Sequence, residues 1–207
     1  MLFHAVKRCA LTWSAERYAL ALDLHRGLNM GILRTLLGND TTTDILELLE
    51  AQHKEVDELF ARLEQGEGDR RALFTELADK LAAHAAAEEK VFYPSVMTND
   101  TSDLLHESVE EHLSIKRVLA DLIAMNVDDD SFKAALSVLK EQVAHHAHEE
   151  EEPNLFPKVR SALTSDERAA LGNEFLVVFE ELMQSHPYKN VPNETQNPAQ
   201  LPSPSRR

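Results

Sequence analysis

The chain of 207 residues is poor in several residue types, and each shortage excludes a class of structure or site. Cys9 is the only cysteine, so neither an intrachain disulfide nor a thiolate metal cage can form. With 6 glycines and 6% aromatic residues, an all-β protein with many tight turns is disfavoured and helices are favoured. No apolar run approaches the ~18 residues that span a bilayer, and charged residues interrupt the N-terminal segment, so we expect a cytoplasmic protein without a secretory leader.

Positive charge is also scarce. The chain carries 21 Lys and Arg against 36 Asp and Glu, which gives a formal net charge of −15. Such a charge repels the phosphate backbone of nucleic acids and the surface of anionic membranes. We therefore expect no nucleic-acid partner and no membrane partner, and cations are the natural ligands. Both a monomer and a homodimer fit the sequence.

Composition divides the chain into four parts. Residues 1–41 form an N-terminal extension, part of which could be helical, and residues 42–160 carry the strongest helical periodicity. Residues 161–185 begin with a capping-box signature and predict an additional helix that packs on the preceding part. Residues 186–207 hold five of the eight prolines and few apolar side chains, which predicts a disordered tail.

Apolar residues recur at spacings of three and four in four segments of residues 42–160, which predicts four helices. Short polar connections separate these segments, so sequential helices should be antiparallel neighbours. The expected fold is all-α: an up-down-up-down four-helix bundle with an additional C-terminal helix. Polar residues interrupt each apolar stripe, and they are His53 in the first segment, His84 and Glu88 in the second, His112 in the third, and His146 and Glu150 in the fourth.

The four helices form an internal repeat. His53 and His112 are followed by apolar residues at the same offsets, and the second and fourth segments both contain a histidine followed by a glutamate. The domain therefore consists of two copies of one helical hairpin. Each of the four histidines lies roughly 20 to 24 Å from its turn at ~1.5 Å per residue, so we expect all four to converge at one end of the bundle.

This convergence predicts a metal site. Residues i and i+4 share a helix face, so each histidine–glutamate pair offers a nitrogen and a carboxylate to the same place. Unpaired carboxylates inside a bundle carry a large desolvation cost, which metal cations remove. Glutamates can bridge two metals while imidazoles bind each one, and this suits two iron ions with open positions. The expected metal ligands are His53, His84, Glu88, His112, His146 and Glu150.

The second glutamate has an alternative. His84 precedes Pro94 by ten residues, whereas His146 precedes Pro157 by eleven. Alignment on the prolines selects Glu151, and the helical phase selects Glu150. We take Glu150, and expect the other glutamates of the run 149–152 to be solvated and His145 and His148 to face a neighbouring helix or water. Glu89 should be solvated, with a supplementary place in the metal shell as the alternative. Tyr93 should pack at the end of its helix, with a hydrogen bond to a metal-bound oxygen species as the alternative.

The ordered pattern H…HxxxE…H…HxxxE over roughly residues 42–160 resembles the hemerythrin-like HHE cation-binding family. This resemblance implies a non-heme di-iron centre, used in the family for oxygen carriage, for iron or oxygen sensing, or for peroxide and nitric oxide chemistry. The oxygen-carrying members have a further histidine four residues before the position of His112, and here that residue is Ser108. Reversible oxygen carriage is therefore disfavoured.

Two functions follow from these expectations. The first is an iron-binding module that takes up O₂, peroxide or NO at the open positions and serves in sensing, storage or stress response. The alternative is a di-iron enzyme that consumes peroxide or activates oxygen. Bundles that activate oxygen use more carboxylates and fewer histidines, so this nitrogen-rich set favours the binding module, and we name no catalytic residue.

Overall fold

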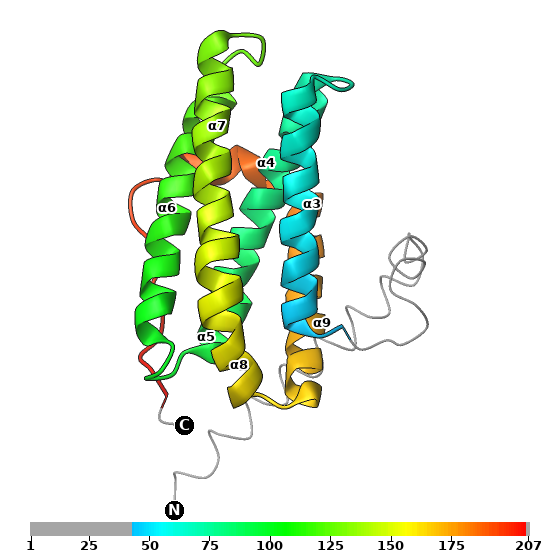
Figure 1. The fold of residues 1–207 in the computed structure, drawn as a ribbon. Coiled ribbons are helices and arrows are strands. Elements are labelled where there is room, and N and C mark those ends of the chain that lie inside the picture. Colours follow the sequence, from blue (N-terminus) through cyan, green and yellow to red (C-terminus); the bar gives the residue numbers. More distant parts are fainter. Residues whose placement is uncertain (1–42, 206–207) are drawn as a thin grey trace, which may run out of the picture. The chain divides into compact units, whose positions relative to one another are not determined.

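The computed structural model describes residues 43–205, and in that part of the chain the protein is a helical bundle without β-strands (Figure 1). Its helices are α3 (Ile45–Gln65), α4 (Arg70–Ala87), α5 (Tyr93–Val96), α6 (Ser102–Ala124), α7 (Asp130–Ala144), α8 (Phe156–Ala162) and α9 (Ser165–Gln184). The predicted all-α bundle with an additional C-terminal helix is confirmed. The N-terminal extension lies outside the described residues. None of the described helices has the length and apolar character that a membrane span requires.

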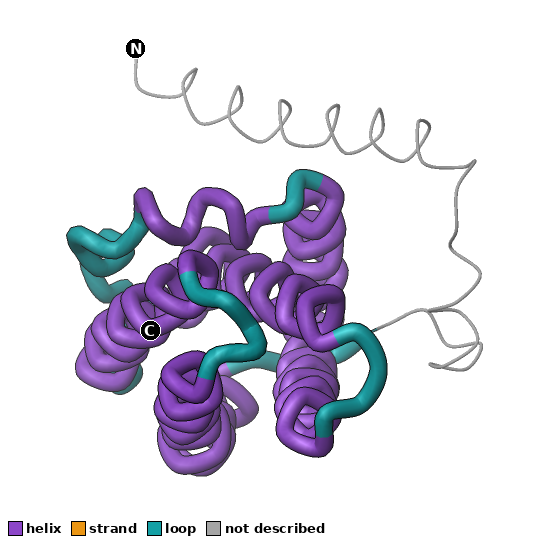
Figure 2. Tube along the Cα trace, turned by 90° about the horizontal axis from the view of Figure 1, so that it is seen from above, coloured by secondary structure: helices purple, strands orange, loops and turns teal. Residues whose placement is uncertain are grey.

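The long helices begin and end at residues with clear local preferences. The Asp44 carboxylate accepts a hydrogen bond from the Leu46 amide at the start of α3, and Asp69 does the same for Ala72 in α4. Gly66 ends α3 in the left-handed conformation with a φ of 70°. Seen from above in Figure 2, short loops join the ends of neighbouring helices, so α3 pairs with α4 and α6 pairs with α7.

Two of the long helices contain a π-helical section. α4 continues through η1 (Glu88–Phe92) into α5, and α7 continues through η2 (His145–Leu155) into α8. In such a section the hydrogen bonds run from residue i to i+5, so residues five apart share a face. Both sections lie where the sequence predicts the site.

Two apolar clusters fill the interior. One cluster, which includes Phe60, Phe74 and Phe132, lies towards the loops that join α3 to α4 and α6 to α7. The other, which includes Phe92 and Phe156, lies on the opposite side of the predicted ligands. Their burial supplies the main favourable free energy of folding. The predicted ligands therefore lie between two apolar layers and not at an uncovered end of the bundle.

Helix α9 packs against α3 and α4. The capping box predicted at its start is present: Thr164 and Glu167 exchange hydrogen bonds between side chain and backbone. Gly172 is buried against the chain before α3, where an added Cβ would overlap the Thr43 carbonyl oxygen. α9 thus covers the outer side of the first hairpin through a close contact that only glycine permits.

The segment after α9 differs from the predicted disordered tail. The short helix η3 (Pro187–Asn193) packs on α4 and α6, and Val191 is buried in the first apolar cluster. Asp79 of α4 accepts hydrogen bonds from the His186 ring and the Tyr188 amide. Apolar side chains such as Val191 and the Asp79 carboxylate hold this segment on the bundle. The proline content of the segment does not predict these contacts.

Candidate metal centre

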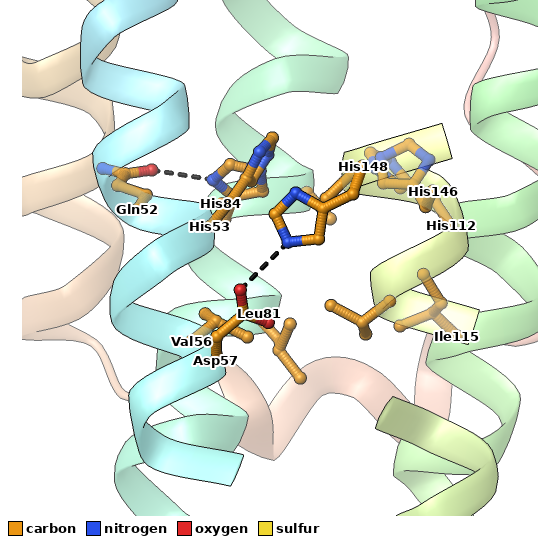
Figure 3. Close-up of a pocket in the computed structure, with 13 residues that line it drawn as sticks. Gln52, His53, Val56, Asp57, Leu81, His84, His112, Ile115, His146 and His148 are labelled. Carbon is orange, nitrogen blue, oxygen red and sulfur yellow. Dashed lines mark hydrogen bonds and ion pairs between the residues drawn. The ribbon is translucent and has the colours of Figure 1, made fainter. Parts of the chain in front are cut away.

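The four predicted histidines form one layer between the two apolar clusters. His53 comes from α3, His84 from α4, His112 from α6 and His146 from η2. All four are buried, and their rings pack closely, with ring centroids 5.0 Å apart for His53 and His84 and 4.6 Å apart for His112 and His146. Figure 3 shows these two pairs of rings on opposite sides of the bundle interior.

Two fully buried carboxylates lie between the ring pairs. Glu88 Oε1 is 3.3 Å from His84 Nε2, and Glu88 Oε2 is 3.3 Å from His112 Nε2. Glu151 Oε2 is 3.5 Å from His53 Nε2 and 3.7 Å from His146 Nε2. Each carboxylate therefore faces one histidine of the first hairpin and one of the second. Two carboxylates in this placement would be able to bridge two cations.

Several donor atoms in this layer are buried without a hydrogen-bond partner: His53 Nε2, His84 Nε2, Glu88 Oε1 and Glu151 Oε2. Glu88 Oε1 and Glu151 Oε2 face His84 Nε2 and His53 Nε2 at 3.3 Å and 3.5 Å, so these four atoms have charged neighbours but no well-formed hydrogen bond. These residues can each place one ligand atom within 4.8 Å of the others. A cation among them would satisfy all four atoms together.

The other ring pair offers a second set of donors. His112 Nε2 and His146 Nε2 lie 3.0 Å apart, and Glu88 completes a group that also meets the 4.8 Å spacing. Two unprotonated ring nitrogens at this distance point their lone pairs at each other. A cation or a proton between them is needed to make the arrangement favourable.

Outer hydrogen bonds fix the orientation of every ring. The Nδ1 atom of His53 lies 2.8 Å from Glu152, that of His84 lies 2.7 Å from Gln52, that of His112 lies 3.1 Å from Glu89, and that of His146 lies 2.7 Å from Glu111. All four partners are oxygen acceptors, so Nδ1 is the donor and Nε2 is left to face the interior. This tautomer and this kind of outer partner are typical of metal-binding histidines.

The structure does not bring Glu150 into the layer. Its side chain is 27% exposed and accepts a hydrogen bond from Asn154, whereas the Glu151 side chain is 1% exposed and faces the histidines. The reason is η2, in which His146 and Glu151, five residues apart, share a face. The helical phase used to choose Glu150 assumed an unbroken α-helix, and the proline alignment gave the residue that the structure places inside.

Pro153 explains this change of helix type. Proline has no amide hydrogen, so it cannot donate to the Glu149 carbonyl as an α-helix requires. The Asn154 side-chain amide donates to that carbonyl instead, at 2.9 Å. The proline inside the segment was therefore the sequence signal for the break, although it does not by itself specify a π-helical section.

Tyr93 is part of the same layer, which differs from the expected place at a helix end. Tyr93 is fully buried, and its hydroxyl group donates a hydrogen bond to Glu151 Oε1 at 2.9 Å. The hydroxyl oxygen of Tyr93 also lies 3.5 Å from Glu88 Oε2. Tyr93 follows Glu88 by five residues, so η1 places both on one face. Glu89 is an outer partner of His112, which agrees with the alternative given for it, and Glu152, for which the sequence predicts a solvated position, is an outer partner of His53.

Electrostatics reflect the crowding of acids and imidazoles. Burial disfavours a charged His53, but the neighbouring carboxylates of Glu151, Glu152 and Glu88 outweigh it and raise the pKa of His53 to about 10. In the same way, Glu88 and Glu89 outweigh burial and raise the pKa of His112 to about 9. Burial opposes ionisation of Glu88, yet the neighbouring histidines hold its pKa well below the ordinary value.

A small cavity adjoins the histidine layer on the side of the first apolar cluster. Its volume is about 30 Å³, enough for roughly one or two water-sized molecules. All four histidines line it, and it reaches the side chains of Asp57 and His148 between α3 and η2 (Figure 3). The apolar lining consists of Val56, Leu81, Ala85, Ile115, Val143 and Ala147.

The fold and the donor set define a cation-binding four-helix bundle, and comparison with known proteins places it in a family. A family model for the hemerythrin HHE cation-binding domain matches residues 44–159. Because this match covers more than half of the chain, the protein belongs to the hemerythrin HHE cation-binding family, whose metal is typically iron.

Two individual proteins are also similar. A crystal structure of a hemerythrin HHE cation-binding domain-containing protein from Mycobacterium kansasii shares the fold, with a TM-score of 0.61 and 24% identity over 72% of this chain and 92% of that one. A DNA nickase from Nostoc sp. is 29% identical over an alignment of 147 residues that covers 68% of this chain and 40% of the nickase. The chain thus spans less than half of that relative.

Proposed function

We propose that the layer holds two iron ions. The first would be bound by His53 and His84, the second by His112 and His146, and Glu88 and Glu151 would bridge them. The mixture of imidazole and carboxylate donors suits iron better than Mg²⁺ or Ca²⁺, which prefer oxygen ligands alone. Glu151 takes the role that the sequence suggested for Glu150. The observation that carries the proposal is that two imidazole nitrogens and two carboxylate oxygens, all buried and none with a hydrogen-bond partner, meet at one point.

We further infer that the centre binds a small ligand such as O₂, peroxide or NO, in sensing, storage or stress response. Iron in this place would supply open coordination positions and one-electron redox chemistry. The adjoining cavity of about 30 Å³ accommodates ligands of this size. Ser108, one turn before His112, donates a hydrogen bond to the Leu104 carbonyl. It adds no ligand nitrogen to His112 and His146, so a coordination position on the second iron would stay open.

Metal analysis and optical spectra test this function directly. Protein purified from iron-supplemented cells should contain about two irons per chain, and its spectrum should change reversibly when NO is added without air. His84→Ala should lose most of the iron, whereas His106→Ala should keep it, because His106 is not among the donors. Iron-free wild-type protein would contradict the centre, and one iron per chain would contradict the pair.

One observation favours the enzymatic alternative. The buried Tyr93 hydroxyl lies within hydrogen-bond distance of both bridging carboxylates, so it can donate a proton to a bound species. If the protein turns over peroxide, Tyr93→Phe should lower the rate by roughly 100-fold while two irons remain bound. Peroxide that disappears no faster than with free iron would leave ligand binding as the function.

A further inference from the structure

One histidine and two carboxylates lie where the cavity reaches the protein surface. The His148 side chain is 37% exposed, and its Nε2 atom is 2.9 Å from Asp57 Oδ2 across the gap between η2 and α3. Its Nδ1 atom is 3.0 Å from Glu152 Oε1. Figure 3 shows the His148 ring projecting towards the space between the two pairs of buried rings. This group therefore connects solvent with the cavity.

Each ring nitrogen of His148 faces one carboxylate oxygen at hydrogen-bond distance, Nε2 towards Asp57 and Nδ1 towards Glu152. A cation at either nitrogen would therefore have a carboxylate oxygen beside it. The atoms of His148, Glu152 and His53 that can bind a metal also lie within 4.8 Å of one another. A cation held by His148 and a carboxylate would thus be next to the buried layer.

The buried end of this path supplies an independent sign of a ligand. His53 Nε2 and His84 Nε2 lack hydrogen-bond partners, and both residues are more than nine-tenths buried and line the cavity that reaches His148. Glu152 contacts both His148 Nδ1 and His53 Nδ1 through its Oε1 atom. The surface group and the buried donors are therefore joined by a shared carboxylate and a shared cavity.

The other side of η2 provides a contrast. His145 also pairs with two glutamates, since its Nδ1 is 3.1 Å from Glu149 and its Nε2 is 3.4 Å from Glu111. His145 is more exposed than His148, and it does not line the cavity. A surface histidine with acidic neighbours is thus present on both sides, but of these two only His148 lies on a path to the buried layer.

We propose that Asp57, His148 and Glu152 form a transit site that captures a divalent cation, Fe²⁺ in the cell, and delivers it to the buried layer. The proposal rests on the proposed function, because it requires that the layer binds metal. The cation keeps its charge and oxidation state throughout, so no further reactant is needed. The strongly acidic chain attracts the cation, and the ordered ligands direct it to one opening.

Rapid mixing of metal-depleted, full-length protein with Co²⁺ tests the transit site, because the absorption bands of bound Co²⁺ report uptake. His148→Ala should take up Co²⁺ about tenfold more slowly than wild type and reach the same final amount. Asp57→Asn, which keeps the size of the side chain, should also be slower. His145→Ala removes a matched histidine away from the cavity and should take up Co²⁺ at the wild-type rate.

The outcomes separate the two proposals. Wild-type uptake rates in both His148→Ala and Asp57→Asn would overturn the transit site and leave the metal centre intact. Equal slowing by His145→Ala would also overturn it, since surface charge alone would then be the cause. A lower final amount of Co²⁺ in His148→Ala would make His148 a ligand of the centre instead. A wild-type protein that takes up no cation would overturn both proposals.

Discussion

Glu150 and Glu151 are neighbours in the sequence, yet their carboxylates lie in different environments. Glu151 is enclosed between His53 and His146, whereas Glu150 is partly exposed beside Asn154. A change of one residue in helical phase decides which of them can bind a cation. The two glutamates therefore form a natural test of the site at the scale of a single residue.

Glu151→Gln should lose metal and Glu150→Gln should retain it. Both changes keep the size of the side chain and remove one charge, so a general effect of charge would be equal in the two variants. Loss of an outer partner costs 10–100-fold in metal affinity, so loss of a bridging ligand should cost at least about 100-fold. Metal content after dialysis measures the difference. Equal metal loss in both variants would show that η2 does not select Glu151.

Metal uptake should release protons. In metal-depleted protein the pKa values of about 10 for His53 and about 9 for His112 keep both rings protonated at pH 7.5. A cation can bind each ring only after its Nε2 atom has lost its proton. We expect release of about two protons per chain on Co²⁺ binding at pH 7.5, measured by titration in weak buffer. Release should fade as the pH rises through about 9 and 10. Metal uptake without proton release would show that His53 and His112 are not protonated in metal-depleted protein.

The same protons affect the stability of metal-depleted protein. Both pKa values are raised above 6.5, so the stabilisation that they give is complete below pH 6.5. It is lost as the pH rises through about 9 for His112 and about 10 for His53. Bound metal replaces these protons, so the loss should be smaller in metal-containing protein.

At the scale of elements, the close contact of α9 with the chain before α3 depends on Gly172. Gly172→Ala would force the two apart, because the new methyl group overlaps the Thr43 carbonyl oxygen. We expect unfolding free energy to fall by about 1–3 kcal/mol in urea denaturation, although alanine favours helices. Ala170→Ser, at an exposed position of α9, should cost only about 0.5 kcal/mol. A neutral or stabilising Gly172→Ala would contradict this packing.

Both π-helical sections act on the site. η1 places Tyr93 on the face of Glu88, and η2 places Glu151 on the face of His146. Without these sections, residues five apart would point in directions about 140° different, because an α-helix turns ~100° per residue. The two hairpins therefore reproduce the internal repeat of the sequence with one difference. The buried glutamate follows its histidine by four residues in the first hairpin (His84 and Glu88) and by five in the second (His146 and Glu151).

At the scale of the whole molecule, the apolar clusters on both sides of the histidine layer should keep the bundle folded without metal. Chelation should leave the helical circular dichroism nearly unchanged and lower unfolding free energy by about 3 kcal/mol relative to protein with metal at a hundredfold excess over its Kd. Urea denaturation with and without chelator measures this change. Glu151→Gln should show no such difference, and a wild-type protein equally stable in both conditions would contradict tight binding.

The sequence by itself determined the helices, their order and five of the proposed ligands. Helical periodicity and short connections specify neighbouring antiparallel helices, and His53, His84, Glu88, His112 and His146 lie on the stripes that such helices bury. These features depend on the regular repeat of an α-helix, which can be counted along the chain. The family resemblance followed from the same residues.

Only the tertiary structure decided the sixth proposed ligand, the outer partners and the course of residues 186–205. Glu151 and not Glu150 faces the histidines because Pro153 interrupts the hydrogen bonds of the helix, and the period of the pattern changes there. The contacts of Gln52 and Glu111 with the histidine rings join different helices, so no spacing along one helix encodes them. Local periodicity fixes which face is buried, whereas the meeting of atoms from separate helices depends on how the whole bundle packs.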